Sequence, residues 1–165
     1  MAEVLSEAGR AEAAEVMKRY PHKRAAILPL FHLVQREHGC ISAEAEEWIA
    51  GELGLHPVKV HEVLTFYTML HLEPVGKWHL QVCRTLSCQL RGCDRLLAHL
   101  GDKYALQNHG VSEDRVFSLE EVECLGACGD APVVQVNDDY HKQLDVETFE
   151  ELLQQLRAQA EGDGS

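Results

Sequence analysis

Two closely spaced pairs of cysteines in the second half of the chain constrain its structure more than any other feature. Four residues separate Cys83 from Cys88, and three residues separate Cys124 from Cys128. The N-terminal stretch MAEVLSEAGRAEAAEV lacks the basic and apolar segments of a signal peptide, so we expect a cytoplasmic protein whose thiols stay reduced. In that compartment, paired cysteines are more often ligands of a metal than halves of disulfides.

The two remaining cysteines have no partner at such a spacing. Cys93 lies on the apolar stripe of a predicted helix, and a free cysteine is among the residues most often buried in a protein core. Cys40 follows Gly39 at the end of another predicted helix. We therefore expect Cys93 to fill the core and Cys40 to be filler or a surface thiol. The ligand candidates are then the four paired cysteines.

Three kinds of thiol site are considered for these cysteines. A structural zinc ion accepts four thiolates in a tetrahedron, and the spacing by itself leaves this alternative open. A thioredoxin-like dithiol centre needs Cys-x-x-Cys at the start of a helix, which neither pair provides. A [2Fe–2S] cluster is wider than one zinc ion, and the small residues Gly126, Ala127 and Gly129 let the backbone wrap closely around it and point N–H groups at sulfur. The residues thus favour the cluster.

Hydrophobic periodicity predicts an α+β fold in two domains, with a helical bundle over residues 1–76 and a mixed domain over residues 77–165. In the helical bundle, Ser42 is expected to cap one helix and Pro57 to begin another. Pro29 falls inside an apolar stripe and predicts a distorted turn or a later start of that helix.

The second domain is predicted to have the element order β-α-β-β-β-α, with the paired cysteines at strand ends. Alternation over WHLQV and the stretch FSLEEVE predict two strands, while PVVQV and YHKQL predict a hairpin. Leu90, Cys93 and Leu100 share a helical stripe that is expected to end at Gly101, and Asp145 is expected to cap the last helix.

The charge balance excludes two classes of partner. The chain has 15 basic and 27 acidic residues, a net charge of −12, which argues against binding to nucleic acid or to anionic membrane surfaces. Its apolar runs fall far short of the ~20 residues needed to span a bilayer, so no direct membrane insertion is expected. The sequence also has no GxGxxG or similar phosphate-binding loop, so we expect neither a flavin nor a nicotinamide to bind here.

Histidines and one aromatic segment are weaker candidates. The ten histidines are scattered and none stands beside either cysteine pair, so a histidine-ligated cluster is not expected. The trio Thr65-Phe66-Tyr67 lies near the domain junction and has two interpretations, packing at a hinge or contact with a partner subunit.

Four stretches of the chain resemble, in order, the E-subunit family of NADH:quinone oxidoreductase, the small iron–sulfur subunit beside the flavin subunit of respiratory complex I. They are YPHKRAAILPLFHLVQREHGCIS, VHEVLTFYTML, VCRTLSCQLRGC and VECLGACGDAPVVQVND. The resemblance extends from Tyr20 to Leu156, and its four-cysteine pattern is highly specific. The departures are Leu64, where the family usually has a small residue, and the additional Cys40 and Cys93.

This resemblance implies a thioredoxin-like ferredoxin domain behind a helical domain, with one [2Fe–2S] cluster on Cys83, Cys88, Cys124 and Cys128. It also implies that FMN and NADH bind to a partner subunit, which exchanges single electrons with the cluster. The complex would hold the chain at the cytoplasmic side of the inner membrane. Related subunits serve NAD-linked hydrogenases and formate dehydrogenases, which stay alternative hosts. The isolated chain has no expected catalytic residue and should oxidise no NADH.

Overall fold

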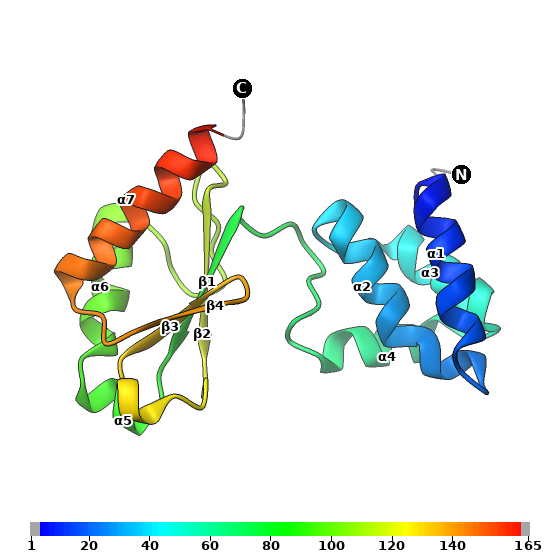
Figure 1. Ribbon diagram of the computed structural model, residues 1–165, viewed down its shortest axis with the longest axis horizontal. Coiled ribbons are helices and arrows are strands. Elements are labelled where there is room, and N and C mark those ends of the chain that lie inside the picture. The colour runs from blue at the N-terminus through cyan, green and yellow to red at the C-terminus, as the bar shows by residue number, and fades with distance from the viewer. Residues whose placement is uncertain (1–3, 163–165) are drawn as a thin grey trace. The chain divides into compact units, whose positions relative to one another are not determined.

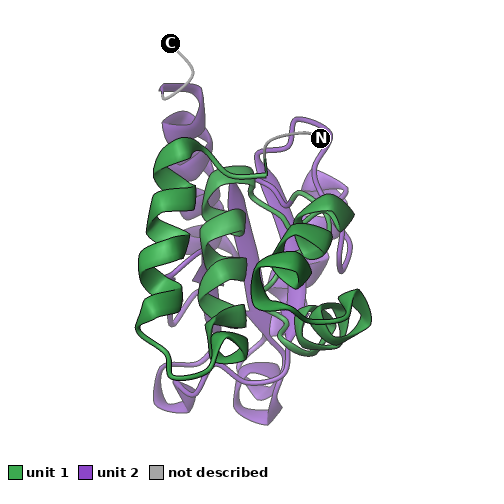
Figure 2. Ribbon diagram, turned by 90° about the vertical axis from the view of Figure 1, so that its right-hand side faces the viewer, with its two compact units in different colours: residues 1–74 green, residues 75–165 purple. Residues whose placement is uncertain are grey.

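A computed structural model of the chain describes residues 4–162. The chain divides into two compact units, residues 1–74 and 75–165, which Figure 1 shows as ribbons and Figure 2 shows in two colours. Each unit has a hydrophobic core of its own. The predicted fold class, α+β with a helical part followed by a mixed part, is confirmed.

Helices with a shared apolar core make up the first unit. Its helical elements are α1 (Glu7–Lys18), the 3₁₀ helix η1 (Lys23–Ala26), α2 (Ile27–His38), α3 (Ala43–Leu53) and α4 (Pro57–Phe66). Phe31 from α2, Ile49 from α3 and Leu64 from α4 are almost completely buried. Helices of 10 to 12 residues are marginal by themselves in water, so burial of these faces holds the unit together.

The helix ends in this unit follow local sequence rules. The hydroxyl of Ser42 accepts a hydrogen bond from the N–H of Ala45 at 3.3 Å and caps α3, and Pro57 is the first residue of α4. The helix α2 begins at Ile27, which places Pro29 in the first turn, where its missing N–H removes no intrahelical bond. The predicted cap at Ser42 and the predicted start at Pro57 are confirmed. The expected distortion or later start at Pro29 is wrong, because α2 begins at Ile27, the first residue of the apolar stripe, and its first turn accommodates the proline.

The second unit combines a four-stranded sheet with helices. Its elements are β1 (Trp78–Cys83), α5 (Leu86–Leu90), α6 (Cys93–Tyr104), β2 (Phe117–Val122), the 3₁₀ helix η2 (Cys128–Asp130), β3 (Val133–Val136), β4 (Asp139–Lys142) and α7 (Val146–Gly162). The strand order is β2-β1-β3-β4, with β1 parallel to β2 and the other neighbours antiparallel. Both long helices, α6 and α7, lie on the same face of this sheet (Figure 1).

Strand alternation decides which side chains meet these helices. Leu80 and Val134 point into the core with Phe149 of α7 and are fully buried. The indole Nε1 of Trp78 donates a hydrogen bond to the backbone oxygen of Leu156 at 2.8 Å and ties β1 to α7. The helix α7 is capped as predicted, because the carboxylate of Asp145 accepts a hydrogen bond from the N–H of Thr148 at 2.8 Å.

The region between β1 and β2 differs from the prediction. Leu90 belongs to a separate short helix, α5, and is 77% exposed instead of lying on the buried stripe of α6. Gly101 does not end α6, which continues to Tyr104 and ends with Ala105 in a left-handed conformation (φ 52°). The extra turn lets the Tyr104 ring pack edge-on against Phe117 at 5.7 Å, and this contact outweighs the low helix propensity of glycine.

The face of the sheet opposite α6 and α7 carries a polar network that the sequence did not reveal. His79 has Nδ1 2.8 Å from the hydroxyl of Ser118 and Nε2 3.2 Å from the carboxylate of Glu120. Gln81 donates to the same carboxylate at 2.9 Å.

Among the helices of residues 4–162, none is long and apolar enough to cross a membrane.

Candidate iron–sulfur site

The parallel pairing of β1 with β2 brings the two cysteine pairs to one end of the sheet. Cys83 is the last residue of β1 and lies opposite Val122, the last residue of β2. The chain then continues through Glu123 into the loop that begins with Cys124. The sulfur of Cys83 is 3.7 Å from the backbone oxygen of Glu123. Thiols that are about forty residues apart in the sequence therefore share one neighbourhood.

The short helix α5 brings Cys88 back to Cys83. Cys88 is 2% exposed, and its thiol lies within hydrogen-bonding reach of the Cys83 thiol. Burial, followed by the hydrogen bond with Cys83, raises the pKa of Cys88 to about 11. The same helix contacts η2, whose first residue is Cys128. An element that the sequence did not reveal thus arranges the inner half of the site.

Hydrogen-bond donors surround the sulfur of Cys83. Burial raises the pKa of this thiol, but hydrogen bonds from the hydroxyl and N–H of Thr85 and from the N–H of Leu125 outweigh it, and the net pKa is lowered. The Thr85 Oγ1 lies 3.1 Å from the sulfur. Such donors stabilise negative charge on sulfur, which is the charge that an iron ligand carries.

The outer pair lies in a surface loop. Cys124 and Cys128 are both exposed. The N–H of Gly126 donates to the sulfur of Cys124 at 3.4 Å, as expected for a loop that points N–H groups at sulfur. Gly126 is in the left-handed region (φ 75°), where glycine is favoured, whereas Gly129 has neither such a φ nor an atom within 4 Å of an added Cβ. The expectation that this loop directs an N–H at sulfur is confirmed at Gly126, and the close approach of Gly126 and Gly129 to a cluster stays a prediction.

The chemistry of the donor set fits an iron–sulfur cluster, because four thiols at one end of a sheet match the ligands of a [2Fe–2S] centre. Within residues 4–162, no group of three or more cysteine, histidine or acidic side chains is gathered closely enough to hold a metal ion. The thiols of Cys83 and Cys88 lie within hydrogen-bonding reach of each other, and Cys124 and Cys128 lie in the segment that follows β2. Cys93 is fully buried in the core as predicted, and Cys40 lies half-buried in the first unit.

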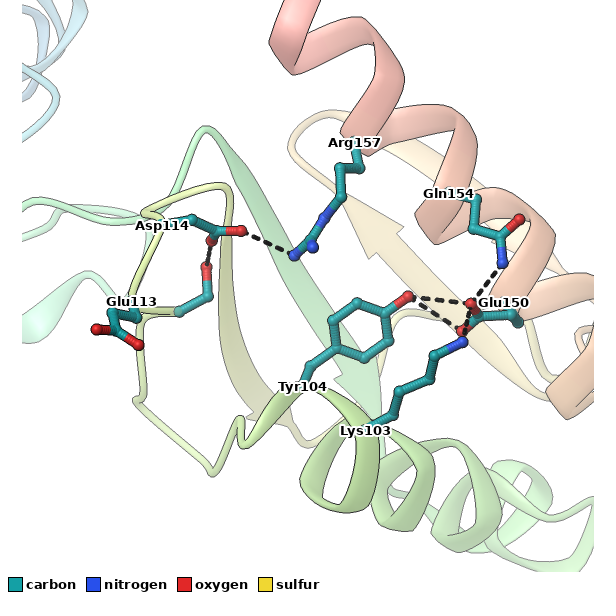
Figure 3. A pocket seen from close by; sticks show the side chains of 8 residues that line it. Lys103, Tyr104, Glu113, Asp114, Glu150, Gln154 and Arg157 are labelled. Carbon is teal, nitrogen blue, oxygen red and sulfur yellow. Dashed lines mark hydrogen bonds and ion pairs between the residues drawn. The ribbon is translucent and has the colours of Figure 1, made fainter.

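A polar pocket of about 600 Å³ lies between α6, the loop after it and α7, lined by side chains other than the cysteines (Figure 3). Glu150 accepts hydrogen bonds there from Lys103, from His99 at 2.7 Å and from Tyr104 at 3.0 Å. Although burial opposes it, this set of donors lowers the pKa of Glu150 to about 2. Arg157 stacks over the Tyr104 ring at 5.5 Å. The carboxylate of Glu150 is satisfied by these donors and Arg157 pairs with Asp114 at 2.8 Å, although the Nε of Arg157 is buried without a hydrogen-bond partner among the described residues. The pocket is therefore mainly a structural link between the two helices.

The second unit therefore has the fold and the thiol set of a thioredoxin-like iron–sulfur protein, and comparison with known proteins agrees. The family model for thioredoxin-like [2Fe-2S] ferredoxins matches residues 13–157. The NADH-quinone oxidoreductase E subunit of Rickettsia bellii (strain RML369-C) is 46% identical over 148 residues, covering 88% of this chain and 89% of that protein. The corresponding E 2 subunit of Rhizobium meliloti (strain 1021) is 44% identical over 149 residues, covering 90% and 89%.

The solved structures add agreement on the fold. A chain of an NAD+-reducing [NiFe]-hydrogenase in the air-oxidized state superposes with a TM-score of 0.71 at 19% identity, over 81% of this chain and 23% of the hydrogenase chain. At that identity the similarity concerns the fold alone. The chain belongs to the thioredoxin-like [2Fe–2S] ferredoxin family and, within it, to the E-subunit family of the NADH-quinone oxidoreductases. The resemblance read from the sequence is thereby confirmed.

Proposed function

We propose that this chain is the electron-transfer subunit of an NADH-quinone oxidoreductase and holds one [2Fe–2S] cluster on its four paired cysteines. The family membership and the names of the relatives support the role. The observation that carries the ligand assignment is the 3.7 Å approach of the Cys83 sulfur to the backbone of Glu123, the residue before Cys124. When bound, the cluster supplies one-electron transfer, and the protein supplies the ligands, their orientation and their shielding from water.

The four cysteines have different tasks in this proposal. Cys83 and Cys88 anchor the cluster against the core, where they are nearly inaccessible to solvent. Cys124 and Cys128 hold its outer side, on an exposed loop through which electrons pass to and from a partner. Burial on one side and exposure on the other suit a subunit that exchanges electrons at a protein surface.

Replacement of each paired cysteine by serine tests the ligand assignment. Iron and sulfide should fall from about two of each per chain to near zero, because a [2Fe–2S] cluster needs four ligands. Cys40→Ser and Cys93→Ala are the matched controls and should keep the full iron content. A colourless protein that contains zinc, or loss of iron in Cys93→Ala with retention in Cys88→Ser, would overturn the assignment.

The flavin FMN and the nicotinamide NADH belong, in this proposal, to a partner subunit of the same complex. That complex holds the chain at the cytoplasmic side of the inner membrane. The purified chain, free of any flavin subunit, should show no NADH–ferricyanide activity, and measurable activity would contradict the proposal.

The helical part, residues 1–76, is proposed to clamp the flavin subunit. Its last helix and the segment that follows expose apolar side chains, with Phe66 75% and Met69 56% accessible. Clustered exposed apolar side chains are typical of protein–protein contacts. This observation favours the partner-contact interpretation for Phe66, whereas Tyr67 of the trio Thr65-Phe66-Tyr67 packs partly buried against the core of the first unit.

A further inference from the structure

Thr85 occupies the N-cap position of α5, yet its hydroxyl makes no capping hydrogen bond. A threonine at that position ordinarily accepts a hydrogen bond from an N–H of the first helical turn. Here the hydroxyl oxygen lies 3.1 Å from the sulfur of Cys83 instead. Thr85 is half-buried and Cys83 is 3% exposed, so water competes little for this contact.

The protonation state of Cys83 decides which atom donates. In the free thiol, either the sulfur or the hydroxyl oxygen can be the donor. A cysteine that binds iron is a thiolate and has no proton to give, so the hydroxyl of Thr85 must then donate. A hydrogen bond to an ionised acceptor is roughly twice as strong as one between neutral groups. Ligation of Cys83 therefore strengthens this contact.

We propose that the hydroxyl of Thr85 raises the midpoint potential of the cluster through its hydrogen bond to Cys83. The inference rests on the proposed function, because it requires Cys83 to be a ligand. Reduction by one electron adds one negative charge next to the sulfur, and a donor at that sulfur stabilises the reduced form more than the oxidised form. Thr85 keeps its proton throughout. The electron comes from the reduced flavin of the partner subunit or, in a titration, from dithionite.

Two backbone donors limit the size of the effect. The N–H groups of Thr85 and Leu125 also donate to the Cys83 sulfur, and both survive a change of side chain. Loss of the hydroxyl therefore leaves both backbone donors in place, and we expect a partial shift of the potential instead of loss of the cluster. The valine side chain has nearly the same shape as threonine, and the missing hydroxyl costs α5 no capping bond.

The test is a redox titration of the full-length protein, followed by visible absorption and by electron paramagnetic resonance of the reduced cluster. Thr85→Val should shift the oxidised-to-reduced ratio at a fixed potential by about threefold to tenfold toward oxidised, where tenfold corresponds to about 59 mV for one electron. Thr85→Ser keeps the hydroxyl and should restore the wild-type potential. Thr148→Val, which removes a hydroxyl from the α7 cap of the same unit, should destabilise the fold without moving the potential.

The outcomes separate this inference from the proposed function. A wild-type protein without a [2Fe–2S] signal, or one that keeps its cluster in Cys83→Ser, overturns the ligand assignment and this inference with it. A normal cluster in the wild type with the same potential in Thr85→Val overturns only the role of Thr85. An equal shift in Thr85→Ser and Thr85→Val also overturns it, because the hydroxyl would then not be the cause.

Discussion

Cys83 and Cys88 lie in β1 and α5 and are nearly completely buried, whereas Cys124 and Cys128 follow β2 in an exposed loop and a short 3₁₀ helix. The sheet and α5 fix the inner pair, and backbone and hydroxyl donors already surround one of its sulfurs. The outer pair has no strand or long helix to hold it. We therefore predict that folding alone fixes the inner pair, and that iron binding further constrains the loop of the outer pair.

The largest expected effect is that of removing the helical unit from the chain. A shortened protein that begins at Gly76 contains all four ligands and the whole core of the second unit, so it should assemble a [2Fe–2S] centre. It lacks the exposed apolar segment around Phe66, so it should fail to copurify with a coexpressed flavin subunit that the full-length chain captures. Iron analysis and affinity copurification measure the two properties. If the shortened protein binds the partner as tightly as the full chain, the helical unit is no clamp.

Hydrogen exchange can compare the two cysteine pairs directly. In metal-free protein, the amides of residues 80–83 should exchange slowly because β1 is central in the sheet, while those of residues 124–130 should exchange quickly. Assembly of the cluster should slow the second group by about tenfold or more and leave the first nearly unchanged, because only the loop gains new constraints. Equal protection of the loop in both forms would show that folding alone organises the outer pair.

The sequence was informative where local chemistry decides the structure. Ser42 and Pro57 mark helix starts by their own hydrogen bonding and φ, and the cysteine spacing identifies the ligand candidates without reference to tertiary structure. The prediction from the sequence failed where contacts between residues far apart in the chain decide the structure. Gly101 stays inside α6 because Tyr104 packs on Phe117, and a five-residue helix such as α5 is too short to show a period. The parallel pairing of β1 with β2, which unites the site, is a property of the whole sheet.

The role of Thr85 has a signal in the sequence, although an ambiguous one. A hydroxyl residue two positions after a ligand cysteine stands close enough to reach back to the sulfur. A threonine before a helix predicts a helix cap equally well. Only the position of the side chain in the folded protein distinguishes the two uses of the hydroxyl.

The network around Glu150 allows the fold of the second unit to be weakened without touching the thiols. The folded state lowers the pKa of Glu150 from 4.5 to about 2, so the stabilisation is fully present above about pH 4.5 and is lost as the pH falls toward 2. Glu150→Gln should therefore lower the unfolding free energy of the metal-free protein on the order of 2 kcal/mol at neutral pH, with a difference that shrinks in acid. Urea denaturation at several pH values measures it.

The neighbouring carboxylate provides the control for that experiment. Glu151 is exposed on the same helix, so Glu151→Gln should change the stability by no more than about 0.5 kcal/mol. The iron content of both variants should equal that of the wild type, because the pocket is separate from the cysteines. Loss of iron in Glu150→Gln at a temperature where the protein stays folded would show that α7 and the inner pair are coupled.

The smallest expected effect comes from two glycines in the loop of the outer pair. Gly126 has φ 75°, a left-handed conformation that costs an alanine about 1 kcal/mol, and no atom lies within 4 Å of the added Cβ to clash with it. If the loop is organised only by the cluster, Gly126→Ala should leave the metal-free protein almost as stable as the wild type. It should speed the loss of iron to a chelator by about fivefold, the equivalent of that strain.

Gly129→Ala meets neither strain nor neighbours and should release iron at the wild-type rate. Should Gly126→Ala destabilise the metal-free protein by the full amount, the loop is already fixed by folding, and the contrast between the two cysteine pairs is one of exposure alone.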